Sequence, residues 1–577
     1  MSLRFIVGRA GTGKTHTCRQ EIQGRLQRDP DGPPLILLVP EQATFQNELA
    51  LASMPGIRGF MRTHVLGFRR LAYRVLSETG GANLPHITDL GKRLVIRQIL
   101  EQHRDCLRIL GRTAHRPGFT DELARVISEL KRYCVLPSRL KSTGEMVKRQ
   151  GNRLLAEKIE DLSLVYGKMA EFLKGRHTDP DDYLSLAAER LAESSLVRGA
   201  EVWVDGFAGF TPQEYLVLKG LLQVAARVNI ALCLDCAYLK EVPDRDDIFY
   251  STWDTLKRIE ALARETQTVI EPPVQLDRIS EPPRRFEAFP ALAFLEKNLH
   301  RHGAKPFPSQ EPQQGIRLVA AANPRVEVEG AAREIIRLCR EKGYRWRDIS
   351  VVVRDLSLYR ELVTTVFSDY QIPFFLDELR VVVHHPVPEL IRSALEVVNS
   401  NWSYEAVFRY LKTDLVPVTR EEVDRLENYV LAHGIDGASW YDDEPWDYRP
   451  SYFPGRSPEK GREGINRRGQ SEDEEIRRIN EIRTRACAAL VDFQKHARGA
   501  KKARDLTTAL FNLLRTLCVP DTLETWITQA EREGELESAR EHAGVWGATL
   551  ALLDQVVEVL GDHEIALDTY ARILDSG

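Results

Sequence analysis

The sequence predicts an α/β protein with two α/β units, each interrupted or followed by long helical segments. Apolar runs of strand length recur along the chain, and the stretches between them carry apolar residues at helical spacing. A glycine-rich loop separates the first apolar run from a helix, which is typical of the start of a βαβ unit. Such alternation predicts a mostly parallel sheet with helices on its faces. The predicted strands are 5–7, 35–39, 201–205, 228–235, 316–319 and 350–354.

The composition is that of an ordinary globular protein of several domains. Hydrophobic residues make up 43% of the 577 residues and charged residues 28%. No window of about 18 uninterrupted apolar residues occurs, so neither a membrane span nor a membrane partner is expected. The net charge of −4 means that nucleic acid would be bound through local basic patches. Eight cysteines without a disulfide framework, and an N-terminus unlike a secretion signal, favour a reduced cytoplasmic location.

The first predicted strand leads into GRAGTGKT at 8–15, which fits G-x-x-x-x-G-K-[ST] at every fixed position. A helix with apolar residues at spacing four follows this phosphate loop. In that context the glycines turn backbone N–H groups toward phosphates, and the helix dipole favours the anion. We expect the Lys14 ammonium to contact the β- and γ-phosphates and the Thr15 hydroxyl to bind Mg²⁺. The predicted nucleotide-binding residues are Gly8, Gly11, Gly13, Lys14 and Thr15.

The elements that follow predict a helical insertion within the first α/β unit. The run 35–39, ended by Pro40, is apolar throughout, as expected of a parallel strand buried on both faces. Two apolar stripes at helical spacing come next: Leu94, Val95, Ile99 and Leu100, and then Leu123, Ile127 and Leu130. The strands at 201–205 and 228–235 then return to the sheet. We therefore predict a first domain at 1–85 and 197–270, split by a helical insertion at 86–196.

Two clusters within this region have alternative interpretations. The run Asp-Pro-Asp-Asp at 179–182 could bind a metal, but Asp179 as a helix cap with Pro180 in the first position explains it better. Cys233 and Cys236 have C-x-x-C spacing without a second pair. Within an apolar strand, Cys233 is better explained as a small buried hydrophobic residue than as a metal ligand.

The second half of the chain repeats the alternation less completely. The Pro-rich stretch 271–315 is predicted to be an interdomain linker. Residues 316–394 begin a second α/β unit, whose helix at 327–342 carries Ala331, Ile335 and Leu338 on one face. Residues 395–577 are predicted to be mainly helical, with a mobile polar loop at 454–478.

Three segments stand out together: GRAGTGKT at 8–15, VPEQATFQNE at 39–48 and VDGFAGFTPQEY at 204–215. They resemble segments of the UvrD-like helicases and, in detail, those of the AddB (RexB-like) family, the B subunits of the AddAB helicase–nucleases. The resemblance covers essentially the whole chain. RTHVLGF at 62–68 is similar to a further DNA-contacting segment of the helicases, and 316–378 is similar to the start of their second motor domain.

This resemblance implies a fold and a function. It implies two RecA-like P-loop motor domains, the second incomplete, with large helical insertions. It implies ATP and Mg²⁺ as cofactors, Asp205 as a Mg²⁺ ligand and Arg354 beside the γ-phosphate. Its implied partners are an AddA-like helicase/nuclease subunit and single- and double-stranded DNA, in the processing of double-strand breaks for recombination and repair.

The chain also departs from the pattern of active helicases. Their Walker B strand ends in Asp-Glu, whereas the pair here is Asp205-Gly206, so the presumed catalytic base is missing and hydrolysis is expected to be weak. Glu41, Gln213 and Glu214 are possible substitutes, and no catalytic residue is assigned. Because the sequence given ends within the second helical insertion, we expect a fragment or a truncated product. It would lack the later helicase motifs, the nuclease domain and the ligands of the family's iron–sulfur cluster.

A basic and aromatic segment follows the second strand of the first domain. Arginines at 58, 62, 69, 70 and 74 are interleaved with Phe60, Phe68 and Tyr73, as in grooves that bind single strands. The alternative is an amphipathic helix whose basic face is merely solvated. The resemblance favours DNA contact, and the predicted residues are Arg62, Thr63, His64 and Phe68.

Three functions are compatible with these observations. The leading one is a nucleotide-binding, DNA-engaging helicase-like subunit with weak ATP turnover of its own. An autonomous DNA-dependent ATPase or helicase is the alternative. A P-loop kinase or signalling NTPase is disfavoured by the helicase-like segments at 35–45 and 316–378.

Overall fold

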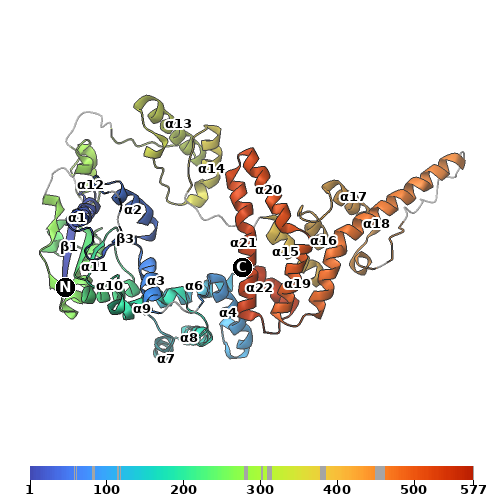
Figure 1. The fold of residues 1–577 in the computed structure, drawn as a ribbon, viewed down its shortest axis with the longest axis horizontal. Helices are drawn as coiled ribbons and strands as arrows, with labels where there is room; N and C mark the ends of the chain where they lie inside the picture. Colours follow the sequence, from blue (N-terminus) through green and yellow to red (C-terminus); the bar gives the residue numbers. More distant parts are fainter. Residues whose placement is uncertain are drawn as a thin grey trace.

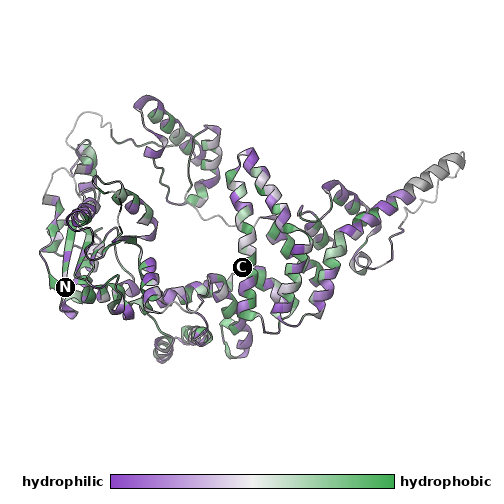
Figure 2. Cartoon of the chain, viewed as in Figure 1, coloured by the Kyte–Doolittle hydropathy of each residue, from purple (hydrophilic) through white to green (hydrophobic). Residues whose placement is uncertain are grey.

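The computed structural model describes an N-terminal α/β domain, a pair of helices and a C-terminal helical bundle, joined by a helical insertion (Figure 1). The described residues are 1–57, 59, 61–80, 85–113, 116, 118–278, 284–300, 303, 305–307, 315–376, 385–442, 444–448 and 462–575. Apolar residues gather where the helices of each part face one another, and polar residues face outward (Figure 2).

The α/β domain is built on one parallel sheet. Its strand order is β3-β2-β4-β5-β1-β6, and β7 also pairs with β1. The strands are β1 (Ser2–Gly8), β2 (Leu35–Leu38), β3 (Thr63–Leu66), β4 (Glu201–Val204), β5 (Arg227–Cys233), β6 (Val269–Ile270) and β7 (Val274–Gln275). The predicted α/β class and the strands at 5–7, 35–39, 201–205 and 228–235 are therefore confirmed. Since β4 and β5 lie between β2 and β1, the chain re-enters the sheet at its middle after the insertion.

Both faces of this sheet are buried. Along β1, Phe5 and Val7 pack into one hydrophobic core, while Ile6 between them packs into the other. The second of these cores includes Cys18 and Ile22 of α1 (Lys14–Arg28). The first is covered by α3 (Phe68–Thr79), α10 (Pro212–Val224) and α11 (Tyr250–Glu265). Burial of each such side chain stabilises the fold by about 1.5–3 kcal/mol, which explains the continuous apolar runs of the strands.

The helical insertion shares its core with the C-terminal bundle. It comprises α4 (Asp89–Gln102), α6 (Phe119–Arg132), α7 (Pro137–Arg149) and α8 (Arg153–Leu173). The two predicted stripes are confirmed, because six of their residues are buried and Leu130 packs against the same core. This core continues into residues far along the chain, such as Leu390 of α15 (Pro386–Asn399) and Tyr570 of α22 (Leu567–Asp575).

One helix of the C-terminal bundle, α21 (Leu536–Leu560), is unusually apolar. Its segment Ser538–Leu560 is long and apolar enough, by length and composition alone, to cross a membrane. Val545, Leu553 and Val556 within it are buried in the core shared with the insertion. The apolar face of α21 is thus used in packing within the bundle.

The structure differs from the sequence-based expectation for the linker. Part of 271–315 belongs to the α/β domain, because β7 pairs with β1 at Ile6↔Val274. The helix α12 (Pro290–Asn298) also packs beside the phosphate loop, as described below.

The start of the second α/β unit also differs. The helices α13 (Pro324–Lys342) and α14 (Leu356–Asp369) pack together through Val328, Ile335 and Val366. Of the face predicted for α13, Ile335 is buried, and Ala331 and Leu338 are half-buried. The runs 316–319 and 350–354 are not strands, and Leu318 and Val352 are 99% and 91% exposed. Apolar runs form strands only when a sheet is there to bury them, and the described residues supply none at this place.

The polar stretch 454–478 was predicted to be a loop. Residues 454–461 lie outside the described part of the chain, but 462–478 are helical and form the start of α18 (Arg462–Gly499). This prediction was therefore wrong for 462–478. A segment rich in Arg and Glu can form a solvated helix without a large apolar stripe.

Candidate nucleotide site and nucleic-acid interface

The phosphate loop connects β1 directly to α1, as its motif predicts. Gly11 and Gly13 have φ values of 79° and 99°, in the region that favours glycine. The Lys14 ammonium donates to the carbonyl oxygens of Gly8 and Arg9, both at 2.8 Å. Thr15 lies in the first turn of α1, whose positive dipole end faces the loop. The five predicted residues thus lie together at the carboxyl edge of the sheet.

Arg9, which occupies a variable position of the motif, ties this loop to three distant carboxylates through hydrogen bonds. Its guanidinium donates to Asp235 at 3.0 Å and to the Glu296 carboxylate at 3.2 Å, and it lies 5.1 Å from the ring centre of Phe249. Its backbone N–H donates to Asp277 at 2.8 Å. Burial opposes the charge of Arg9, but the hydrogen bonds to Asp235 and Glu296 outweigh it and raise the pKa of Arg9. The sequence motif gave no signal for this role.

Asp205 follows β4 near the first turns of α1. Its side chain is buried, with 5% of the residue exposed, and no hydrogen bond to its carboxylate is recorded within the described part of the chain. Burial and the nearby Asp205 carboxylate raise the pKa of the Cys18 thiol, which lies one turn after Thr15. A buried carboxylate without a protein donor, close to the helix that carries Thr15, fits the oxygen ligands that Mg²⁺ prefers.

Gly206, where the sequence analysis expects a missing catalytic glutamate, has a backbone that favours glycine. Its φ is 85°, and a Cβ added there would lie 3.1 Å from Cδ of Pro40. The three possible substitutes for the missing base are engaged elsewhere. Glu214 caps α10 through Thr211, the Gln213 amide donates to the carbonyl of Asp181, and Glu41 accepts the N–H of Arg69.

The arginine predicted to sense the γ-phosphate lies in another part of the structure. Arg354 is exposed beside α14, and no hydrogen bond or ion pair between it and the phosphate loop is recorded among the described residues. The structure therefore does not bring Arg354 to the other nucleotide-binding residues.

A basic and aromatic hollow of about 550 Å³ lies on β3 and α3. Arg70 and Tyr73 line it, and Tyr73 is 56% exposed. Arg69 lines this hollow and also a second one of about 420 Å³ at the carboxyl edge of β2 and β4. The elements α2 (Thr44–Ala52), β3 and α3 lie on the side of the α/β domain that faces the rest of the molecule (Figure 1). The first hollow is thus a basic surface next to the sheet edge, whereas Glu41, Asp181 and Glu214 line the second together with Arg69 and Arg132.

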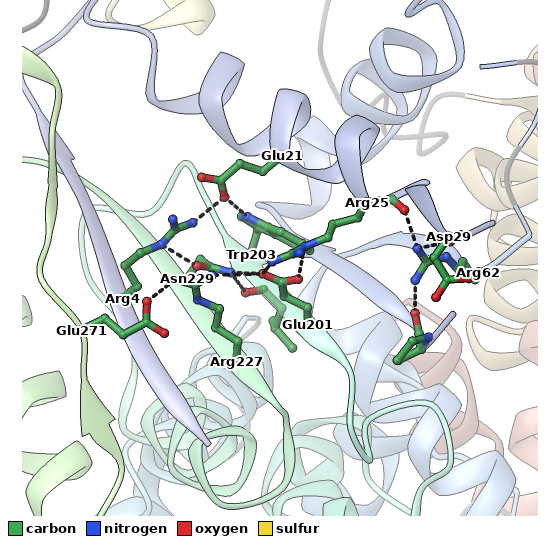
Figure 3. Close-up of polar contacts among 12 residues, drawn as sticks. Arg4, Glu21, Arg25, Asp29, Arg62, Glu201, Trp203, Arg227, Asn229 and Glu271 are labelled. Atoms are coloured by element: carbon green, nitrogen blue, oxygen red, sulfur yellow. Dashed lines mark hydrogen bonds and ion pairs between the residues drawn. The ribbon is translucent and has the colours of Figure 1, made fainter. Parts of the chain in front are cut away.

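The four predicted DNA-binding residues occupy different environments. Arg62 donates to the backbone carbonyls of Arg25, Asp29 and Pro33 at the amino edge of the sheet (Figure 3). Thr63 and Phe68 are buried, although Thr63 contributes to the lining of the first hollow. Phe68 packs edge-on against the rings of Phe207 and Phe210, with centroids 5.4 and 5.9 Å away.

His64 is the predicted residue that lies in the hollow itself. Its Nδ1 is 2.8 Å from the Arg74 guanidinium. Burial, and then the charge of Arg74, lower the pKa of His64. Arg69, Arg70 and Tyr73 also line the hollow and are exposed; the sequence analysis grouped them with this segment but did not select them. Arg58 and Phe60 lie outside the described residues.

Comparison with known proteins identifies the family. The sequence model described as "ADDB, N-terminal" matches residues 5–296. The chain belongs to the AddB family. It is 54% identical to the B subunit of the ATP-dependent helicase/deoxyribonuclease of Desulforudis audaxviator and 50% identical to the same subunit from Pelotomaculum thermopropionicum. Each match covers 100% of this chain and 49% of the relative, so the chain spans about half the length of these relatives.

In this AddB-family chain, the acidic run 179–182 is a buried ion cluster. Asp179 caps the turn by accepting the N–H of Asp181, as predicted. Lys92 of α4 lies 2.8 Å from Asp179, and Lys131 of α6 lies 2.7 Å from both Asp179 and Asp182. Two buried lysines therefore neutralise these carboxylates, and no group of three metal-ligating side chains is found in the described ranges. The cluster holds α4 and α6 to the turn at 179–182 within the insertion.

The C-x-x-C pair of this AddB-family chain is arranged in the opposite sense to the prediction. Cys233, at the end of β5, is exposed, whereas Cys236 is buried. Burial raises the pKa of Cys236 to about 11, and its thiol donates weakly to the Val7 carbonyl. The prediction of Cys233 as a buried residue was wrong, because along β5 the core on its face of the sheet ends at Ala231, whereas Leu232 and Leu234 belong to the core of the other face.

Proposed function

We propose that this chain is the nucleotide- and DNA-binding, helicase-like part of an AddB-type subunit with weak ATP hydrolysis of its own. In this role it serves a helicase/nuclease complex that processes double-strand breaks in recombination and repair. Its relatives are named as one of the subunits of a helicase/deoxyribonuclease, which supports an AddA-like partner. Its free cysteines suit a cytoplasmic location.

One observation carries the proposal of binding with weak turnover. The Asp205 carboxylate is buried beside the helix of Lys14 and Thr15, whereas the next residue is a glycine with a positive φ. Thr15 and Asp205 would hold Mg²⁺, which neutralises phosphate charge when it is bound. Lys14 and the loop N–H groups would orient the triphosphate. Gly206 can neither accept a proton nor orient a water, a role typically worth about 10²–10⁴-fold in rate.

We further propose that 316–376 starts a second RecA-like domain. The exposed apolar runs at 316–319 and 350–354 support this, because their residues require a sheet to bury them. The basic hollow on β3 and α3 supports contact with single-stranded DNA, in which phosphates meet Arg69 and Arg70 and a base stacks on Tyr73.

The test is the ATPase rate of the purified chain with and without single-stranded DNA, beside Lys14→Ala. We expect a slow rate in the wild type and nucleotide binding that Lys14→Ala abolishes. A DNA-stimulated rate of several turnovers per second, lost in Lys14→Ala, would favour the autonomous ATPase and reject weak turnover. Failure of the intact protein to co-purify with an AddA-like subunit would reject the subunit role.

A further inference from the structure

A segment that follows the sheet lies across the outer side of the phosphate loop. It runs from η7 (Arg284–Phe286) to the end of α12, and we call it the strap. A Cβ placed on Gly11 would lie 2.8 Å from Cε2 of Phe286 and 3.2 Å from Cβ of Arg285. Since even one added carbon would collide, the Phe286 ring and the tip of the loop are in tight contact.

Arg9 fastens the strap to the loop at a second point. Its guanidinium donates to both the carboxylate and the backbone carbonyl of Glu296, the latter at 2.8 Å. The Arg9 side chain is only 13% exposed, so this ion pair is partly shielded from water. Partly buried pairs of this kind are stronger than exposed surface pairs.

The same contacts bear on Lys14. The Arg9 carbonyl accepts hydrogen bonds from the Lys14 ammonium and from the Thr12 hydroxyl, at 2.8 and 2.9 Å. By holding Arg9 in place, the strap therefore also holds the Arg9 carbonyl in the position where it accepts a hydrogen bond from Lys14. A phosphate competes with these carbonyls for Lys14.

The strap also places one carboxylate, that of Glu296, beside the loop, although it carries Arg284, Arg285 and Lys297 as well. Asp235, Asp277 and Glu296 all contact Arg9, and Glu296 is the one that the strap contributes. A nucleoside triphosphate places several negative charges on this loop, well within the screening length of about 8 Å at physiological salt. The Glu296 carboxylate and the triphosphate therefore repel each other.

We propose that the strap is an autoinhibitory clamp on the phosphate loop. The closed strap lowers the affinity of the loop for a nucleoside triphosphate, and the bound triphosphate opens the strap. The two effects are equal in free energy, because coupling between two binding events is reciprocal. This inference rests on the proposed nucleotide site. Since the strap precedes α13 and α14, nucleotide binding is transmitted to the connection between the α/β domain and this pair of helices.

The affinity for Mg-ATP, measured by isothermal titration calorimetry, tests the clamp. Glu296→Gln removes the strap's charge at constant size, and Phe286→Ala removes its contact with Gly11. Each variant is expected to bind Mg-ATP about 5-fold more tightly than the wild type, at the low end of typical coupling energies. The matched control is Glu287→Gln, because Glu287 is exposed on the same strap and no contact with the loop is recorded for it in the described part of the chain. Its affinity should stay within about twofold of the wild type.

Hydrogen exchange provides the second measurement. Mg-ATP is expected to speed amide exchange in the peptide 286–298 of the wild type but not of Lys14→Ala. Unchanged or weaker binding in both strap variants, or slower exchange of the strap with Mg-ATP, overturns the clamp while leaving the nucleotide site intact. Absence of any ATP binding by the wild type overturns the proposed function and the clamp together.

Discussion

Replacing Gly206 by glutamate creates the Asp-Glu pair that the sequence analysis expects of active helicases, but the backbone opposes the change. With φ at 85°, any L-residue costs about 1–2 kcal/mol relative to glycine. The added Cβ also lies 3.1 Å from the rigid Pro40 ring, which costs up to about 1 kcal/mol more in overpacking. We therefore expect Gly206→Glu to destabilise the α/β domain by about 2 kcal/mol, a fall in Tm of about 4–8 °C. ATP hydrolysis should stay as slow as in the wild type.

Thermal unfolding and a steady-state ATPase assay with single-stranded DNA check this prediction. Gly206→Ala should lose nearly as much stability as Gly206→Glu, because the cost lies in the backbone and the Cβ. Gly24→Ala is the matched control, since Gly24 lies within α1 with nothing within 4 Å of its added Cβ. It should gain about 0.5–1 kcal/mol. A Gly206→Glu protein with wild-type Tm and DNA-stimulated turnover would refute the argument from backbone strain.

Three further predictions concern other parts of the chain. Lys131→Met removes the lysine partner of Asp182, whereas Asp179 keeps Lys92, and should cost about 1–3 kcal/mol in urea unfolding; an unchanged midpoint would show that the Lys131 contacts are not needed. Arg70→Ala should weaken binding of single-stranded DNA and reduce the slope of log affinity against log salt concentration by about 0.7. Arg62→Ala should instead lower Tm and leave DNA binding unchanged. Loss of DNA binding in Arg62→Ala, with a lower Tm in Arg70→Ala, would contradict the structure. Iodoacetamide at pH 7.5 should label Cys233 in the native chain and leave Cys236 unlabelled until unfolding, as peptide mass mapping can show, because Cys236 is buried and its pKa is raised.

The sheet of the α/β domain could be predicted from the sequence because its signal is local. Strands such as 35–38 are buried on both faces, so every residue is apolar, and the glycine loop after β1 has a fixed spacing. The same signal was misleading at 316–319, where the apolar run has no sheet to join among the described residues. An apolar run indicates that a segment needs to be buried, but it does not show that neighbouring strands are there to bury it.

The candidate site could be predicted only in its motif residues. Arg9 occupies a variable position of the loop, and its partners Asp235 and Glu296 lie 226 and 287 residues away. No spacing rule links residues at such separations. Likewise, Phe68 was predicted to bind DNA, but it is buried against Phe207 and Phe210, which follow the insertion in the sequence.

The core shared by the insertion and the C-terminal bundle has a consequence during synthesis. Residues such as Leu94 and Ile127 leave the ribosome long before their partners near Leu510 and Tyr570 exist. At about 5–20 residues per second, the insertion helices wait on the order of 20–80 s for the rest of their core. During that interval their apolar faces stay open to chaperones or to other nascent chains. The risk of aggregation during synthesis is therefore highest for α4 and α6, although both pack into the core of the folded protein.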